Sequence, residues 1–202
     1  LFSCVLGFAL AVPLAVARTS PRRWIALPSR LFMSAFRGTP LLVQIFILYY
    51  GLAQFEWVRD SVLWLLLDDA FSCALLALTL NLAAYMAEDL RGGILGVPAG
   101  EKEAATAFGM SRLMVTWYIV VPRAIGIVAP TLGNEIVLQL KSTALASTIT
   151  VLDLTGVARR LSIEAYTTDA LLLAGLLYIV IAAVLSLLIK YGEARLNLHQ
   201  PR

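Results

Sequence analysis

The chain has 202 residues, of which 60% are apolar and only 14% are charged, with a formal net charge of +3. A soluble domain is nearer half apolar and a quarter charged, and a globule of this length cannot bury so many apolar side chains. These proportions exclude a disordered chain, a collagen-like chain and most soluble enzymes. They indicate a protein embedded in a lipid bilayer.

Five apolar segments approach the roughly 20 residues that a helix needs to cross a bilayer. They are Leu1–Ala17, Leu31–Gly51, Ala70–Ala87, Trp117–Leu140 and Ala170–Ile189. The first segment lacks the basic start and cleavage site of a signal peptide, so we expect it to be the remainder of a spanning helix whose beginning is absent. Pro40 weakens the start of the second segment, and Pro122, Pro130 and Gly133 predict that the fourth is a discontinuous helix.

Most Lys and Arg residues fall in three places: the segment 18–37, the segment 88–123 and the C-terminal tail. The other two connections are richer in Asp and Glu. Basic residues favour the cytoplasmic side of a membrane, and the two sets of connections alternate if there are five spans. The sequence therefore predicts an outside N-terminus, a cytoplasmic C-terminus and a cytoplasmic loop over residues 88–118.

That loop has a pattern of its own. Gly92-Gly93 and Gly96-Val97-Pro98 break regular structure, and the stretch 100–108 then strongly favours a helix. Gly109 permits a left-handed helix end and Ser111 is suited to cap a following helix. We expect a short helix, a turn and a second helix that enters the fourth span. The short helix is either a docking element or a solvated loop helix.

Polar side chains within the spans are costly and often functional. Asn81 and Tyr85 lie four residues apart, on one face of the third span, and Glu88 follows them. Asn81 and Tyr85 suit a polar solute and suit a hydrogen bond between helices equally well. In the fourth span Glu135 and Gln139 share a face. Arg37 is expected to anchor at the lipid headgroups.

Enzymatic chemistry finds little support in the sequence. The single histidine, His199, lies near the C-terminal end, and Cys4 and Cys73 both sit in apolar runs. There is no cluster with metal-ligand spacing and no glycine-rich phosphate-binding loop. We therefore expect that the chain is not an enzyme by itself and holds neither ATP nor a metal cofactor.

The loop also carries the sequence Glu103-Ala104-Ala105, then Gly109, then Ile119-Val120-Val121-Pro122. This pattern resembles the EAA motif of the permease subunits of ABC importers, with Val121 in place of the usual Leu. The segment Leu140–Thr150 is most similar to the histidine/lysine/arginine/ornithine and octopine/nopaline permease subunits of that family. Four other stretches resemble the polar amino acid branch of the family. They are Phe36–Gln44, Leu80–Glu88, Arg91–Ile94 and Gly133–Glu135 with Lys141-Ser142-Thr143.

The resemblance implies an all-α polytopic membrane protein, with about five transmembrane helices and a cytoplasmic coupling helix, in a MetI-like ABC permease fold. The whole chain, 1–202, would form one permease domain in the bacterial inner membrane. Its implied partners are a second permease subunit (a paralogue or a second copy), two ATP-binding subunits that hold ATP and Mg, a periplasmic substrate-binding protein and an amino acid substrate. No nucleic acid is among them.

The resemblance also implies site residues. Glu103, Ala104, Ala105 and Gly109 would couple the permease to an ATPase subunit. The substrate path would include Asn81, Tyr85, Glu88 and Glu135, and Asp169 at the outer start of the fifth span is a further carboxylate for a cationic substrate. The alternative function is a self-sufficient secondary transporter or channel, which usually has a longer chain with internal repeats.

Overall fold

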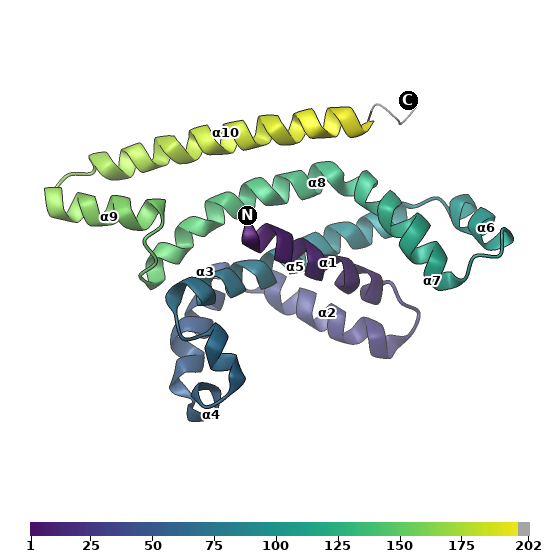
Figure 1. The fold of residues 1–202 in the computed structure, drawn as a ribbon, viewed down its shortest axis with the longest axis horizontal. Coiled ribbons are helices and arrows are strands. Elements are labelled where there is room, and N and C mark those ends of the chain that lie inside the picture. Colours follow the sequence, from purple (N-terminus) through teal and green to yellow (C-terminus); the bar gives the residue numbers. More distant parts are fainter. Residues whose placement is uncertain (198–202) are drawn as a thin grey trace.

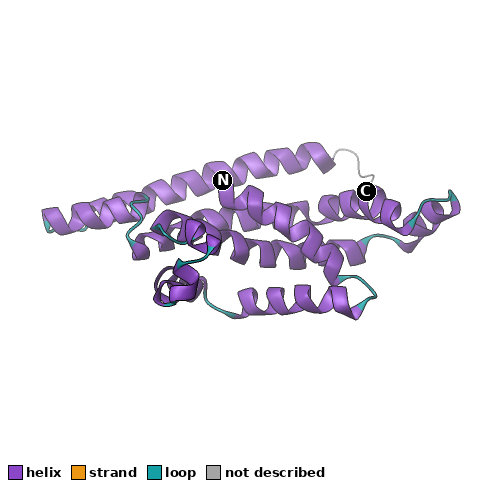
Figure 2. Ribbon diagram, turned by 60° about the horizontal axis from the view of Figure 1, so that its bottom comes forward, coloured by secondary structure: helices purple, strands orange, loops and turns teal. Residues whose placement is uncertain are grey.

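The computed structural model describes the backbone of residues 1–197 and the side chains of residues 1–194, so that His199 lies outside the described residues. Within this part the regular elements are all helices (Figure 2). The α-helices are α1 (Phe2–Arg18), α2 (Arg23–Gly38), α3 (Leu41–Phe46), α4 (Glu56–Arg59), α5 (Ala70–Gly96), α6 (Ala99–Ala107), α7 (Arg112–Met114), α8 (Val121–Ser142), α9 (Leu154–Ala165) and α10 (Asp169–Asn197). Short π- or 3₁₀-helices cover Ile47–Gly51, Leu52–Gln54, Val62–Leu66, Val115–Val120 and Thr143–Ile149.

Helix α5 is the centre of the bundle, packed against α1, α2 and α8 (Figure 1). The face between α1 and α5 is built from small side chains, and Ala11, Ala15, Ala83 and Ala87 are fully buried. Small residues let helix backbones approach closely, which is how helices associate where lipid supplies no hydrophobic driving force. The core of the protein is therefore this close contact between an early helix and the central one.

The fourth predicted span is continuous. One helical run covers Arg112–Ile149, although it contains Pro122 and Pro130. The prediction of a discontinuous helix is wrong because the wide π-helical stretch Val115–Val120 directly precedes Pro122 and adjusts the backbone around it. Proline is also tolerated in membrane helices where neighbouring groups satisfy the backbone.

The second predicted span is instead the broken one. Arg23–Gly38 and Leu41–Gln54 meet at an angle of 105°. Thr39 and Pro40 between them are extended, with ψ angles of 144° and 134°. Proline has no N–H to donate and pushes the residue before it out of the helical region, so the chain turns at this point. Among the described residues, three helices are long and apolar enough to cross a membrane, and this bent pair brings the number to four. Helix α1 is apolar but has 17 residues.

The expected break at Gly92-Gly93 is absent from the structure. Helix α5 continues to Gly96, past the predicted end of the span at Ala87. Gly92 and Gly93 lie within this helix. A Cβ at Gly93 would lie 2.8 Å from the carbonyl oxygen of Ala124, so glycine here lets α5 and α8 touch. The helix–turn–helix that follows is confirmed: α6 ends in a turn in which Gly109 has φ +82°.

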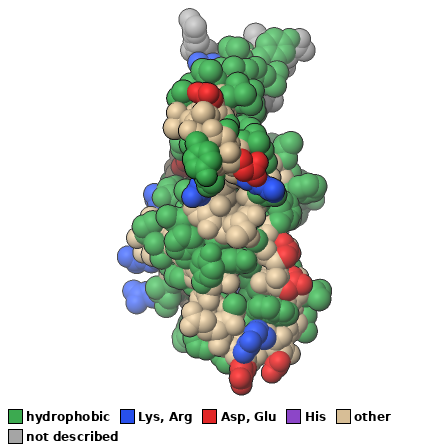
Figure 3. Space-filling model, turned by 90° about the vertical axis from the view of Figure 1, so that its left-hand side faces the viewer, with side chains coloured by type: hydrophobic (Ala, Val, Ile, Leu, Met, Phe, Trp, Pro, Cys, Tyr) green, Lys and Arg blue, Asp and Glu red, His purple; other side chains and the backbone are tan. Residues whose placement is uncertain are grey.

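The molecule is elongated, and its two ends differ (Figure 1). Helices α6 and α7 form one end and α9 forms the other, while α4 projects at the bottom of the view. Figure 3 faces the α9 end, where acidic and basic side chains are interspersed with apolar ones. Helix α10 packs on α8 and α9 and is otherwise almost entirely exposed.

Candidate translocation cavity and docking helix

A cavity of about 340 Å³ lies where the bent pair meets α5 and α8. The bend contributes one wall, α5 contributes a second and α8 with its 3₁₀ extension a third. The lining residues are Thr39, Pro40, Leu41, Asn81, Leu82, Tyr85, Glu135, Leu138, Gln139, Ser142 and Leu145. Three residues that the sequence suggested for a substrate path, Asn81, Tyr85 and Glu135, therefore line one cavity.

An amide cluster fixes the bend that forms the first wall. The buried Gln44 donates its side-chain N–H groups to the carbonyl oxygen of Phe36 at 2.8 Å, to that of Thr39 at 3.1 Å and to the Thr39 hydroxyl at 2.8 Å. Asn81 on α5 donates to the Gln44 Oε1 at 3.1 Å and to the same Phe36 oxygen at 3.2 Å. The side chains of Gln44 and Asn81 thus replace the backbone bonds that a broken helix loses.

Of the two alternatives for Asn81, the structure shows the hydrogen bond between helices. Its NH₂ group is used in the hydrogen bonds between helices, while the residue also lines the cavity. Among the described residues nothing bonds to its carbonyl oxygen, Oδ1, which leaves one acceptor for a solute.

The α8 wall supplies a carboxylate. Glu135 is half-buried and lines the cavity. Its neighbour one turn on, Gln139, donates instead to Ser3 at 3.1 Å and to the carbonyl oxygen of Leu78 at 3.0 Å, so it ties α8 to α1 and α5. Glu135 is therefore the charged group of the cavity wall, and Gln139 is chiefly a packing residue.

Glu88 lies outside the lining and is paired with two arginines. Its Oε1 accepts hydrogen bonds from the Nε of Arg91 at 3.0 Å and from the Nη2 at 2.5 Å. Its Oε2 lies 3.7 Å from the Nη1 of Arg37. The Arg37 guanidinium also covers the ring of Tyr85, 5.5 Å from the ring centre. Arg37, which we expected at the headgroups, instead folds onto α5.

Asp169 lies elsewhere. It lines a separate pocket of about 650 Å³ between α9 and α10, together with Arg159, Tyr166 and neighbouring residues. This pocket is at the α9 end of the molecule, so the structure does not bring Asp169 together with Asn81, Tyr85 and Glu135.

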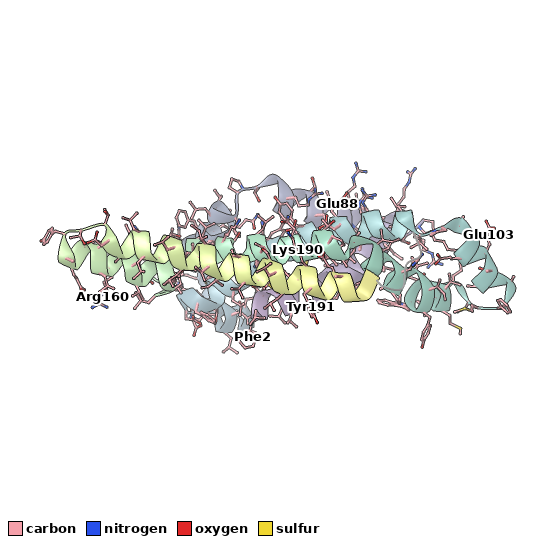
Figure 4. All side chains as sticks on the ribbon, turned by 90° about the horizontal axis from the view of Figure 1, so that it is seen from above. Phe2, Glu88, Glu103, Arg160, Lys190 and Tyr191 are labelled. Carbon is pink, nitrogen blue, oxygen red and sulfur yellow. The ribbon has the colours of Figure 1, made fainter. Side chains whose placement is uncertain are left out.

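The predicted coupling residues lie on α6 and the turn behind it. Glu103 and Ala104 are exposed, Ala105 is buried against the bundle, and Phe108 at the tip is 90% exposed. Figure 4 shows Glu103 at one end of the molecule and Arg160 at the other. Helix α6 is attached to its neighbours on the inner side by Lys102 Nζ, 3.4 Å from the carbonyl oxygen of Ile94, and by Glu101, 3.2 Å from Arg123.

Sequence reasoning missed two residues. Gln44 was part of a motif but was not expected in the site, although a lone amide inside the apolar run Leu41–Phe46 was a usable signal. Arg37 had no signal of this kind, because its partner on α5, Glu88, is about fifty residues away in the sequence. The bend between α2 and α3, which directs the Arg37 side chain toward α5, was not predicted.

A helical membrane bundle with a cavity that a few polar side chains line, and with a short exposed helix at one end, fits a transport permease rather than an enzyme. The family model for the inner membrane component of binding-protein-dependent transport systems matches residues 5–198, and the chain belongs to this family. Permeases of this kind generally work with ATPase subunits and a binding protein, and hydrolysis takes place in the separate ATPase subunits.

Named relatives agree with this membership. The chain is 50% identical over 193 residues to an octopine transport system permease protein of Rhizobium radiobacter, a match that covers 95% of this chain and 79% of the relative. It is 42% identical over 195 residues to a histidine/lysine/arginine/ornithine transport system permease protein of Salmonella typhimurium, covering 96% and 83%.

Solved structures show the same fold. A crystal structure of an amino acid ABC transporter with histidines superposes with a TM-score of 0.82 at 32% identity, over 96% of this chain and 87% of that one. The inward-facing methionine ABC transporter superposes with a TM-score of 0.78 over 96% and 89% of the two chains. At 14% identity this second likeness shows the fold alone. The expected MetI-like permease fold is confirmed.

Proposed function

We propose that this chain forms part of the translocation path of an ATP-driven importer for basic or polar amino acids or an opine, in the bacterial inner membrane. The names of the octopine and histidine/lysine/arginine/ornithine permeases support this substrate class. The placement of Lys and Arg supports an outside N-terminus and a cytoplasmic C-terminus.

The observation that carries the proposal is the cavity. Asn81 and Tyr85 face it from α5 and Glu135 from α8, in a volume of about 340 Å³, which is at the small end of ligand pockets. A half-buried carboxylate attracts a cation more strongly than it would in bulk water, because the surrounding dielectric is lower. In this assignment Glu135 pairs with the ammonium or guanidinium group of the substrate, and Asn81 Oδ1 accepts one of its N–H groups.

The exposed end carries the coupling. Helix α6 presents Glu103 and Ala104 outward while Ala105 packs inward, so one face is free for an ATPase subunit. Because α6 is attached to α5 and α8, a displacement of α6 moves both helices that line the cavity. ATP and Mg bind in the ATPase subunits in this scheme, and this chain binds neither. A second permease subunit and a periplasmic binding protein complete the transporter.

Reconstitution into proteoliposomes tests the proposal. The complex of both permeases, the ATPase subunits and the binding protein should accumulate labelled arginine or octopine only with ATP. Accumulation by this chain alone, driven by an ion gradient, would establish the secondary transporter instead. Failure of the complete complex to accumulate any amino acid or opine would refute the substrate class.

The Glu135→Gln variant tests the site within the same complex. Loss of the cavity carboxylate should raise the KM for a cationic amino acid about tenfold, the factor that corresponds to one weak charge pair. The KM for a neutral amino acid should change little. Asn134→Gln is the matched control, because Asn134 is the exposed neighbour on α8. Equal KM values for Glu135→Gln and wild type would remove Glu135 from the site.

A further inference from the structure

Arg37 occupies a distinctive place beside the cavity. Its guanidinium covers the ring of Tyr85, and Tyr85 also lines the cavity. Glu88, the other contact of Arg37, is three residues beyond Tyr85 on α5, about 4.5 Å along the helix axis in the direction of α6. In Figure 4 Glu88 lies between the α9 end, marked by Arg160, and Glu103. A solute that moved from the cavity toward the α6 end would pass Arg37.

The contacts of Arg37 are weak compared with those of its neighbour. Arg91 makes two short hydrogen bonds to Glu88 Oε1, whereas Arg37 approaches only the second oxygen, at 3.7 Å. In the part of the chain that the structure describes, no hydrogen bond holds the Arg37 side chain, and it is 41% exposed. If Arg37 moved away, Glu88 would keep Arg91 and would not be left as an uncompensated charge.

The backbone beneath Arg37 is, by contrast, firmly held. Arg37 is in the last turn of α2, and the bonds from Gln44 to Phe36 and Thr39 fix the residues on both sides of it. The side chain can therefore swing while the cavity wall stays in place. Arg37 thus has a fixed backbone, a long side chain and two weak contacts, with Tyr85 and Glu88. These are the features that a side-chain gate needs.

We propose that Arg37 is a movable cationic gate at the α6-facing exit of the cavity, closed over Tyr85 when the cavity is empty. The inference rests on the proposed function, which sets the direction of passage. In the closed position the Arg37 charge repels cations that would leak through. A cationic substrate competes with Arg37 for the same ring and the same carboxylate, so that its arrival favours the open position.

The test measures passive leak in the complete complex without ATP. Proteoliposomes loaded with labelled arginine should lose it about fivefold faster with Arg37→Gln than with wild type, the factor for losing one weak cation–π and ion-pair contact. Arg37→Lys keeps the positive charge and should stay near the wild-type rate. Arg30→Gln removes the same charge from an exposed position on α2 and should leave the leak unchanged.

Two results would overturn the gate. One is a wild-type leak rate for Arg37→Gln in a complex that assembles normally, and the other is a leak for Arg37→Lys as fast as that for Arg37→Gln. If Arg37→Gln does not assemble, Tyr85 gives the second test: Tyr85→Leu should leak and Tyr85→Phe, which keeps the ring, should not. Equal leak from the two Tyr85 variants also rejects the gate. Failure of the proposed function is distinguishable, because the wild-type complex would then show no ATP-driven uptake.

Discussion

Replacing Asn81 with Ala should destabilise the bend between α2 and α3 before it alters any contact with substrate. The substitution removes two hydrogen bonds, to Gln44 Oε1 and to the Phe36 carbonyl oxygen. The Phe36 oxygen keeps its 2.8 Å bond from Gln44, but Gln44 Oε1 loses the Asn81 donor. The variant therefore creates one buried acceptor without a partner.

The size of the effect follows from this geometry. Hydrogen bonds between membrane helices are worth about 0.6 kcal/mol on average and about 1.7 kcal/mol at most, and a buried unsatisfied group costs about 1–3 kcal/mol. Asn81→Ala should thus lower the free energy of unfolding by about 1–3 kcal/mol. Gln44→Ala removes three donated bonds as well as the acceptor and should cost about 2–4 kcal/mol.

A double-mutant cycle measures the bond that the two residues share. SDS-driven unfolding in mixed micelles gives the free energy for Asn81→Ala, Gln44→Ala and the double variant. Because Asn81 and Gln44 contact each other, the double variant should cost less than the two single variants together, by about 0.6–1.7 kcal/mol. Asn134→Ala, which removes an exposed amide from α8, should be within about 0.5 kcal/mol of wild type.

Strict additivity of the two variants would refute the reasoning, since it would mean that Asn81 and Gln44 stabilise the protein independently. Uptake measurements on the same variants separate the two roles of Asn81. Asn81→Asp keeps an oxygen at the cavity and loses the donor group, so it should lose stability as Asn81→Ala does but bind a cationic substrate better than Asn81→Ala.

Two glycines give further predictions. Gly93→Ala places a Cβ 2.8 Å from the Ala124 carbonyl oxygen and should lower the Tm of the purified permease measurably. Gly92→Ala is the control, because no atom lies within 4 Å of its Cβ, and it should leave the Tm unchanged. Equal Tm values for the two variants would mean that α5 and α8 separate at no cost. Gly109→Asp forces a β-substituted residue to φ +82°, at a cost of about 1 kcal/mol. It should leave membrane insertion intact and uncouple ATP hydrolysis from uptake, and normal coupled uptake would contradict the coupling role that we propose for α6.

The sequence was informative where local chemistry decides the structure. Apolar length located three of the five predicted spans, those within α5, the helical run Arg112–Ile149 and α10. Gly109 with Ser111 located the turn behind α6, because a left-handed residue and a helix cap act within a few residues. The same local reasoning singled out Asn81, Tyr85 and Glu135 as polar residues in apolar segments, and the structure brings all three to one cavity.

Prediction from the sequence failed where contacts between residues far apart in the chain decide the local structure. Pro122 and Pro40 look alike in the sequence, yet the first continues a helix and the second bends one by 105°. The difference lies in what surrounds them: a π-helical stretch precedes Pro122, while Gln44 and Asn81 supply the bonds that hold the bend at Pro40. Likewise Gly93 suggests a helix break in the sequence, and only the structure shows that Ala124, 31 residues later, lies against it.

The contact between α1 and α5 has a consequence for how the chain is made. A membrane protein is synthesised from its N-terminus, so α1 is complete long before α5 emerges from the ribosome. The stripe of Gly7, Ala11 and Ala15 that will meet α5 has no matching surface until then. Before α5 is made, α2 is the main packing partner available to α1. The insertion of α5 is therefore the step that completes the packing around α1.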